Sequence, residues 1–205
     1  DPYSASKGCA ELMVAAYQRS YFQKAAQLRV ASGRAGNVIG GGDWSMYRIV
    51  PDCARALVAG QPLVLRRPQA VRSWLHVLDA VYGYLLLAAR LWADPTRQVC
   101  TGWNFGPEAE GVCSVEKLAT LFAAAWGGGS VVHHEGAELF HEAPLLVLDS
   151  QKARQELGWC PAWSFGESVR RTAAWYRNWH QGSDVRRLCQ EEIAAYRGAI
   201  HQPGG

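Results

Sequence analysis

Apolar positions along the chain recur at two spacings, which predict two kinds of element. Stretches with an apolar residue at every third or fourth position predict helices, and short continuous apolar runs predict strands. The expected helices cover residues 3–26, 48–59, 77–91, 114–126, 150–157, 165–179 and 184–196. The expected strands cover residues 28–34, 63–65, 103–105 and 145–148. Helices that alternate with short strands indicate an α/β fold.

Local signals support these assignments. Ser114 and Ser150 each stand where a helix N-cap is expected. The helix over residues 3–26 has apolar residues on several faces, which is typical of a helix packed on a sheet. Residues 36–42 are rich in glycine and are expected to form a loop at the carboxyl end of a buried strand, a place where ligands bind in open α/β sheets. The stripe that makes the helix over 77–91 amphipathic consists of Val77, Val81, Tyr84, Ala88 and Leu91.

The composition argues against several classes of protein. The 205 residues are 49% apolar, enough for one sizeable core or two small ones, and the net charge is +3. The longest basic stretches are the pairs at 66–67 and 170–171, so no nucleic-acid-binding face is expected. No apolar run approaches the roughly 18 residues of a membrane span, and no secretory signal begins the chain. Six cysteines without a C-x-x-C pair indicate reduced thiols in a cytoplasmic protein.

Tyr3 and Lys7 are the first candidates for chemistry. Four positions apart on a helix, they place a phenol and an ammonium on one face, one turn apart. A positive charge beside a phenol stabilises the phenolate, the form in which a tyrosine acts as a general base. An ordinary exposed pair has the same spacing, so from these two residues alone both interpretations stay open.

The residues around this pair resemble an enzyme family. The run YSASK at 3–7 is followed by a long helix, a strand and the run RAGNVIG at 34–40. This order is similar to that of the extended short-chain dehydrogenases/reductases, which include NAD-dependent nucleotide-sugar epimerases and dehydratases. The resemblance implies that Tyr3 is the acid/base for a sugar hydroxyl. It also implies that Lys7 binds the nicotinamide ribose of NAD and tunes Tyr3.

The resemblance continues through the glycine-rich segment. GNVIGGGDW at 36–44, with Arg48 shortly after it, looks like the corresponding stretch of CDP-glucose 4,6-dehydratases within this family. It implies that Asn37 contacts the diphosphate of the nucleotide sugar and that Arg48 belongs to the substrate site. The alternative for Asn37 is a turn residue. The segment is not a phosphate-binding P-loop, because no G-K-[ST] follows at the required spacing.

A third segment, VRSWLHV at 71–77, resembles the R-x-W-x-x-V segment of sugar-nucleotide dehydratases. There the arginine binds the pyrophosphate with both arms of its guanidinium, so the resemblance assigns Arg72 to the substrate. The alternative for Arg72 is a surface ion pair. For Trp74 and His76, core packing and a satisfied imidazole fit at least as well as contact with a ligand.

The remaining histidines differ in what they suggest. His141 lies in a segment that resembles the last substrate-side segment of the family, which implies a place near the ribose or base of the nucleotide. His133 and His134 have no metal-ligand spacing with any carboxylate, so no metal site is expected.

The resemblance as a whole implies an architecture and a reaction. The expected fold is the C-terminal part of a Rossmann-type parallel sheet, formed by residues 1–42 and 72–110. A small α/β substrate-binding domain would be formed by residues 43–71 and 111–205. The implied function is the dehydration of CDP-glucose with tightly bound NAD, as in deoxysugar and O-antigen biosynthesis, by a cytoplasmic homodimer or tetramer.

The start of the chain leaves alternatives open. The chain begins with Asp1 and Pro2, without a methionine and inside the motif of Tyr3. Three family features lie upstream of that tyrosine and are not among these residues: the glycine-rich G-x-x-G-x-x-G turn, the acidic residue for the adenosine ribose, and the Thr/Ser-Asp-Glu/Lys catalytic segment. We therefore expect a C-terminal fragment. A nucleotide-sugar 4-epimerase and a sugar-nucleotide-binding chain without catalysis remain alternatives.

Overall fold

The computed structural model describes residues 2–22, 28–134 and 145–201, and it has the α/β architecture that the sequence predicts. Its helices are α1 (Pro2–Ser20), α2 (Ile49–Val58), α3 (Val77–Ala93), α4 (Val115–Trp126), α5 (Gln151–Leu157), α6 (Phe165–His180) and α7 (Val185–Ile200). Its strands are β1 (Ser32–Ala35), β2 (Asn37–Ile39), β3 (Leu63–Leu65), β4 (Val71–His76), β5 (Gly102–Phe105), β6 (Val112–Ser114), β7 (Val131–His133) and β8 (Leu145–Leu146). Within the described residues, no helix is long and apolar enough to cross a membrane.

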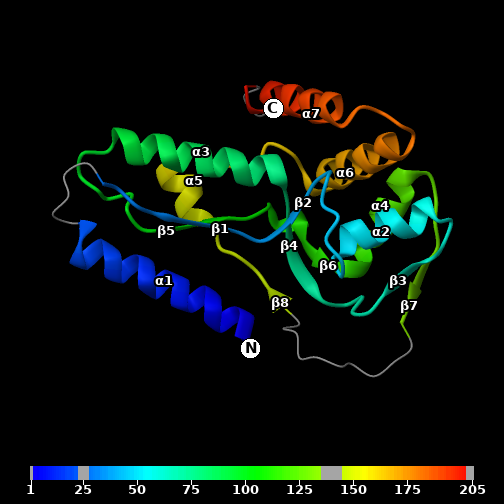
Figure 1. The fold of residues 1–205 in the computed structure, drawn as a ribbon, viewed down its shortest axis with the longest axis horizontal. Coiled ribbons are helices and arrows are strands. Elements are labelled where there is room, and N and C mark those ends of the chain that lie inside the picture. Colours follow the sequence, from blue (N-terminus) through cyan, green and yellow to red (C-terminus); the bar gives the residue numbers. More distant parts are fainter. Residues whose placement is uncertain (1, 23–27, 135–144, 202–205) are drawn as a thin grey trace.

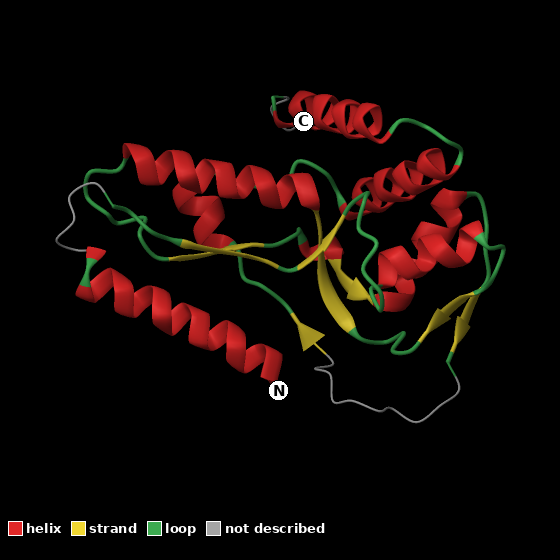
Figure 2. Ribbon diagram, in the orientation of Figure 1, coloured by secondary structure: helices red, strands yellow, loops and turns green. Residues whose placement is uncertain are grey.

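β4 is the central strand of the largest sheet. β2 and β8 pair with it in parallel, and β6 pairs with it antiparallel. Two further parallel pairs are formed by β1 with β5 and by β3 with β7. Parallel strands need crossover connections, and helices supply them here. Figure 1 shows β4 in the middle of the molecule, and Figure 2 shows helices above and below the strands.

The chain passes from β1 to β2 through Gly36 alone. A side-chain carbon at this position would lie 2.8 Å from the carbonyl oxygen of Ser73 on β4, so glycine is required for the strands to approach this closely. Residues 37–39 then pair with residues 74–76 of β4. The expectation of a loop over 36–42 is therefore wrong for residues 37–39, because their backbone groups take part in this pairing.

Two other local expectations need correction. The strand predicted over 28–34 begins only at Ser32, and none of its residues is buried. Ser150 precedes α5, but its side chain does not cap the helix. The amide of Gln151 donates instead to Oδ1 of Asp149, at 2.8 Å. A neighbouring carboxylate has therefore taken the role predicted for the serine.

Two clusters of buried apolar side chains hold these elements together. The larger cluster lies among α2, α4 and α6 and includes Phe122 and Tyr176. The smaller cluster lies among α3, α5 and β5 and includes Phe105 and Trp159. α5 therefore packs with α3 and β5, in the smaller of the two clusters. The division of the chain into two domains stays a prediction.

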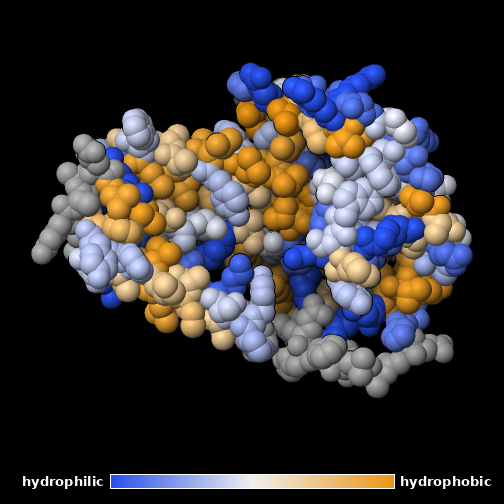
Figure 3. Space-filling model, in the orientation of Figure 1, coloured by the Kyte–Doolittle hydropathy of each residue, from blue (hydrophilic) through white to orange (hydrophobic). Residues whose placement is uncertain are grey.

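α1 is joined to the rest of the molecule by polar contacts. None of its residues is buried, so the expectation of a helix packed on a sheet is wrong for the described chain. The amide nitrogen of Gln18 donates to the carbonyl oxygens of Val30 and Cys100, at 2.6 and 3.1 Å. Glu11 accepts a hydrogen bond from the hydroxyl of Ser32 at 2.9 Å. Apolar side chains reach the surface over α1 and over α3 (Figure 3).

α3 has the predicted position but buries a different face. Its buried residues are Asp79, Ala80, Gly83 and Leu87. Most of the predicted stripe is exposed, namely Val77, Val81, Tyr84 and Ala88. A side-chain carbon on Gly83 would lie 2.4 Å from Cδ1 of Phe105. The missing side chain lets α3 approach β5, and this close approach decides which face is covered.

Candidate functional site

Tyr3 and Lys7 lie in the first two turns of α1. Nζ of Lys7 is 5.6 Å from the centroid of the Tyr3 ring, so the predicted pair shares one face of the helix. Both side chains are exposed, Tyr3 by 69%. In Figure 1 the amino end of α1 points toward the middle of the molecule. A ligand placed there could contact the phenol and the ammonium together.

Asn37 and Arg72 lie on neighbouring strands. The Cα of Asn37, the first residue of β2, is paired with that of Trp74 on β4. Because residues two apart on a strand share a face, Arg72 lies on the same face of the sheet as Asn37. Arg72 is only 5% exposed, and its Nη1 donates to the carbonyl oxygen of Val71 at 2.8 Å. Arg72 is therefore a buried side chain, and its assignment to the substrate stays a prediction.

Arg48 is the residue before α2 and has an exposed side chain. It follows residues 40–47, which we call the Trp44 loop and which connect β2 to α2. Burial alone would raise the pKa of Asp43, which lies in this loop. Hydrogen bonds from Ser45 and the positive charges of Arg48 and Arg55 outweigh this effect and lower the pKa of Asp43 below its usual value. The positive charge of Arg48, just before α2, therefore lies near the ionised carboxylate of Asp43.

Trp74 and His76 have structural roles. Nε1 of Trp74 donates to the carbonyl oxygen of Cys113 at 3.0 Å. Nδ1 of His76 accepts from the amide of Leu78 at 3.2 Å and caps α3. Burial, together with the charge of Arg171, lowers the pKa of His76 to about 3, so its imidazole is neutral. Core packing and a satisfied imidazole explain both residues.

The other histidines provide no metal site among the described residues. Nε2 of His133 contacts Oε1 of Glu116 at 2.8 Å, and His134 is exposed. No group of three potential metal ligands is found in the described part of the chain. His141 lies outside the described residues, and its assignment to the nucleotide stays a prediction.

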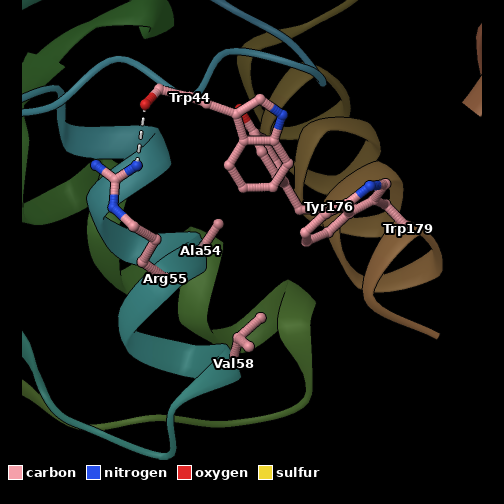
Figure 4. A pocket seen from close by; sticks show the side chains of 6 residues that line it. All are labelled: Trp44, Ala54, Arg55, Val58, Tyr176 and Trp179. Atoms are coloured by element: carbon pink, nitrogen blue, oxygen red, sulfur yellow. Dashed lines mark hydrogen bonds between the residues drawn. The ribbon is translucent and has the colours of Figure 1, made fainter. Parts of the chain in front are cut away.

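The structure also reveals a small pocket beside the Trp44 loop that the sequence did not indicate. Its volume is about 140 Å³, and Figure 4 shows its lining: Trp44, Ala54, Arg55, Val58, Tyr176 and Trp179. Tyr176 belongs to the helical stripe predicted at 165–179, a pattern that indicates burial. No pattern in the sequence shows that Tyr176 or Arg55 contacts this loop.

The comparisons with known proteins point to one family. Residues 1–100 match the NAD dependent epimerase/dehydratase family. The chain is 39% identical over 203 residues to the CDP-glucose 4,6-dehydratase of Salmonella typhimurium (strain LT2), which covers 97% of this chain and 56% of that enzyme. It is 32% identical over 178 residues to the dTDP-glucose 4,6-dehydratase of Streptomyces antibioticus, which covers 86% of this chain and 49% of that enzyme.

The fold of this chain is also similar to that of a solved nucleotide-sugar dehydratase. DesIV, a dTDP-glucose 4,6-dehydratase from Streptomyces venezuelae with NAD and TYD bound, matches with a TM-score of 0.71 at 25% identity, covering 91% of this chain and 53% of that chain. Residues 1–100 thus match the NAD dependent epimerase/dehydratase family, and almost the whole chain is similar to nucleotide-sugar 4,6-dehydratases. It spans about half the length of the relatives that it matches.

Proposed function

We propose that the whole protein is an NAD-dependent nucleotide-sugar 4,6-dehydratase that converts CDP-glucose to CDP-4-keto-6-deoxyglucose. The observation that carries this proposal is the 39% identity to a CDP-glucose 4,6-dehydratase across 97% of the chain. The identity to a dTDP-glucose enzyme is lower, at 32%, which favours CDP-glucose as the substrate. The common face of Asn37 and Arg72 supports a diphosphate site on β2 and β4.

Tyr3 and Lys7 fit the cofactor side of this reaction. Their side chains are exposed on one face of α1, where a ribose and a sugar hydroxyl could reach both. NAD⁺, when bound, would supply the acceptor for the hydride from sugar carbon 4 and the hydride that returns to carbon 6. Tyr3 would take the proton of the 4-hydroxyl as general base. Lys7 would stabilise the phenolate and donate to the ribose.

The substrate side is formed by residues of the central sheet and α2. Arg72 would bind the pyrophosphate with both arms of its guanidinium. The amide of Asn37 would donate to a phosphate oxygen, and Arg48 would add a second positive charge. A ketone at carbon 4 acidifies the proton at carbon 5, so water can leave across carbons 5 and 6. A substrate held by its diphosphate would keep these carbons in reach of Tyr3.

Isotope labelling tests this proposal. The whole protein is given CDP-glucose deuterated at carbon 4, and the product is examined by NMR and mass spectrometry. A dehydratase yields a 4-keto-6-deoxy sugar with the deuterium at carbon 6. CDP-galactose that keeps the label at carbon 4 would identify a 4-epimerase instead.

A panel of nucleotide sugars tests the choice of substrate. Turnover of dTDP- or UDP-glucose without turnover of CDP-glucose would contradict the nucleotide assignment. Binding of CDP-glucose without any turnover would favour a sugar-nucleotide-binding protein.

A further inference from the structure

The Trp44 loop is held by donors from three different parts of the chain. The hydroxyl of Tyr176 on α6 donates to the carbonyl oxygen of Asp43 at 2.6 Å. The two arms of Arg55 on α2 donate to the carbonyl oxygens of Trp44 and Ser45, each at 3.2 Å. Nη2 of Arg66, just after β3, donates to the carbonyl oxygen of Tyr47 at 3.4 Å.

The side chains of the loop are packed as well. The ring of Trp44 lies 5.2 Å from that of Tyr176 and 4.3 Å from that of Trp179 (Figure 4). A side-chain carbon on Gly41 would lie 2.0 Å from Trp175, so the loop lies directly against α6. Loops without such contacts lose more entropy when they become ordered around a ligand.

Tyr47 adds backbone strain at the end of the loop. Its φ angle is 62°, in the left-handed region that a bulky residue rarely adopts. Strain of this kind persists where surrounding contacts impose it, and it is concentrated at functional sites. Tyr47 directly precedes Arg48, so the same contacts determine how the chain enters α2.

We infer that Arg55 and Tyr176 are positioning residues, which hold the Trp44 loop and thereby place Arg48 for the nucleotide sugar. The inference rests on the proposed function. The loop joins β2, whose first residue is Asn37, to Arg48 at the start of α2, so its conformation sets the distance and orientation between these two proposed contacts. Because the donors fix the loop on folding, the ligand does not have to order it on binding.

Two pairs of variants separate positioning from stability. Arg55→Met removes both donors to the loop, and Arg177→Met removes a guanidinium that donates to the carbonyl oxygen of Trp126, away from the loop. Tyr176→Phe removes the hydrogen bond to Asp43. Tyr196→Phe removes a phenol hydrogen bond elsewhere in the protein, which goes to Asp79 at 2.7 Å. Each control loses a hydrogen bond that does not involve the loop, so it shows what a loss of stability alone does to binding.

The measurements are made on the whole protein by calorimetric titration with CDP-glucose and by hydrogen exchange of the amides of residues 40–48. Arg55→Met and Tyr176→Phe should each raise the dissociation constant about tenfold and speed loop exchange about tenfold. The controls should leave both unchanged. Arg55→Lys, which restores one donor, should recover part of the affinity.

The possible results distinguish a failure of the positioning role from a failure of the proposed function. If CDP-glucose binds equally to wild type, Arg55→Met and Tyr176→Phe, the positioning role is refuted. It is also refuted if loop exchange is unchanged, or if the controls weaken binding as much as the test variants. A whole wild-type protein that binds neither CDP-, dTDP- nor UDP-glucose contradicts the proposed function. Loop exchange then still shows whether Arg55 and Tyr176 hold the loop.

Discussion

Asp79 should make the stability of this protein depend on pH in a direction unusual for a carboxylate. The residue is fully buried at the start of α3. Its Oδ1 accepts from the amide of Ala162 and from the hydroxyl of Tyr196, each at 2.7 Å. Its Oδ2 is buried without a hydrogen bond among the described residues. Burial raises the pKa of Asp79 from 3.8 to about 6, and hydrogen bonds from Tyr196, Ala162 and Trp163 offset part of this effect.

The sign and size of the effect follow from the two pKa values. Between pH 3.8 and about 6, the folded state holds a proton that the unfolded state has released. The free energy of unfolding therefore falls as the pH rises through this range and is constant, for this group, above it. Since one pKa unit corresponds to about 1.4 kcal/mol, the total loss is about 3 kcal/mol.

Asp79→Asn tests this reasoning. The asparagine keeps the acceptor for Ala162 and Tyr196 but does not titrate, so any cost of its buried NH₂ is the same at every pH. We expect the difference in free energy of unfolding between variant and wild type to change by about 3 kcal/mol, in favour of the variant, from about pH 4 to pH 7. Urea denaturation at a series of pH values measures it. A difference that does not change with pH would refute the argument.

A carboxylate with the opposite behaviour serves as a control. Hydrogen bonds from Thr96 lower the pKa of Asp94. The stability that Asp94 contributes is present above its unfolded pKa and is lost as the pH falls. Asp94→Asn should therefore give a pH-dependent difference of opposite sign to that of Asp79→Asn.

Four further substitutions, the last of them a control, test the site and the fold. In the whole protein, Tyr3→Phe should lower turnover by about 10²–10⁴ with little change in substrate affinity, and unchanged turnover would show that Tyr3 is not the base. Arg72→Lys should raise the dissociation constant for CDP-glucose about tenfold in titration calorimetry, because one ammonium replaces a two-armed donor; equal affinity would remove Arg72 from the diphosphate site. Gly41→Ala should lower the free energy of unfolding by about 1–3 kcal/mol in urea denaturation, because the new carbon overlaps Trp175. Gly8→Ala, with no neighbour within 4 Å, should not destabilise the protein.

Much of the local structure follows from the sequence, because its causes act over a few residues. The strand predicted at 63–65 has those bounds, and the helix predicted from Ser114 to 126 is α4, with Ser114 accepting from the amide of Lys117 at 3.1 Å. A left-handed Gly127 ends that helix at the predicted place. Apolar spacing and capping residues depend on near neighbours and can be read along the chain.

The tertiary structure decided which faces are buried and which side chains meet. α3 carries apolar residues on two faces, and Gly83 against Phe105 determined which one is covered. Asn37 and Arg72 share a sheet face only because β2 pairs with β4 in this register. Arg55 and Tyr176 are far apart in sequence, and both hold the Trp44 loop. These contacts depend on how elements pack across long separations, which no local periodicity records.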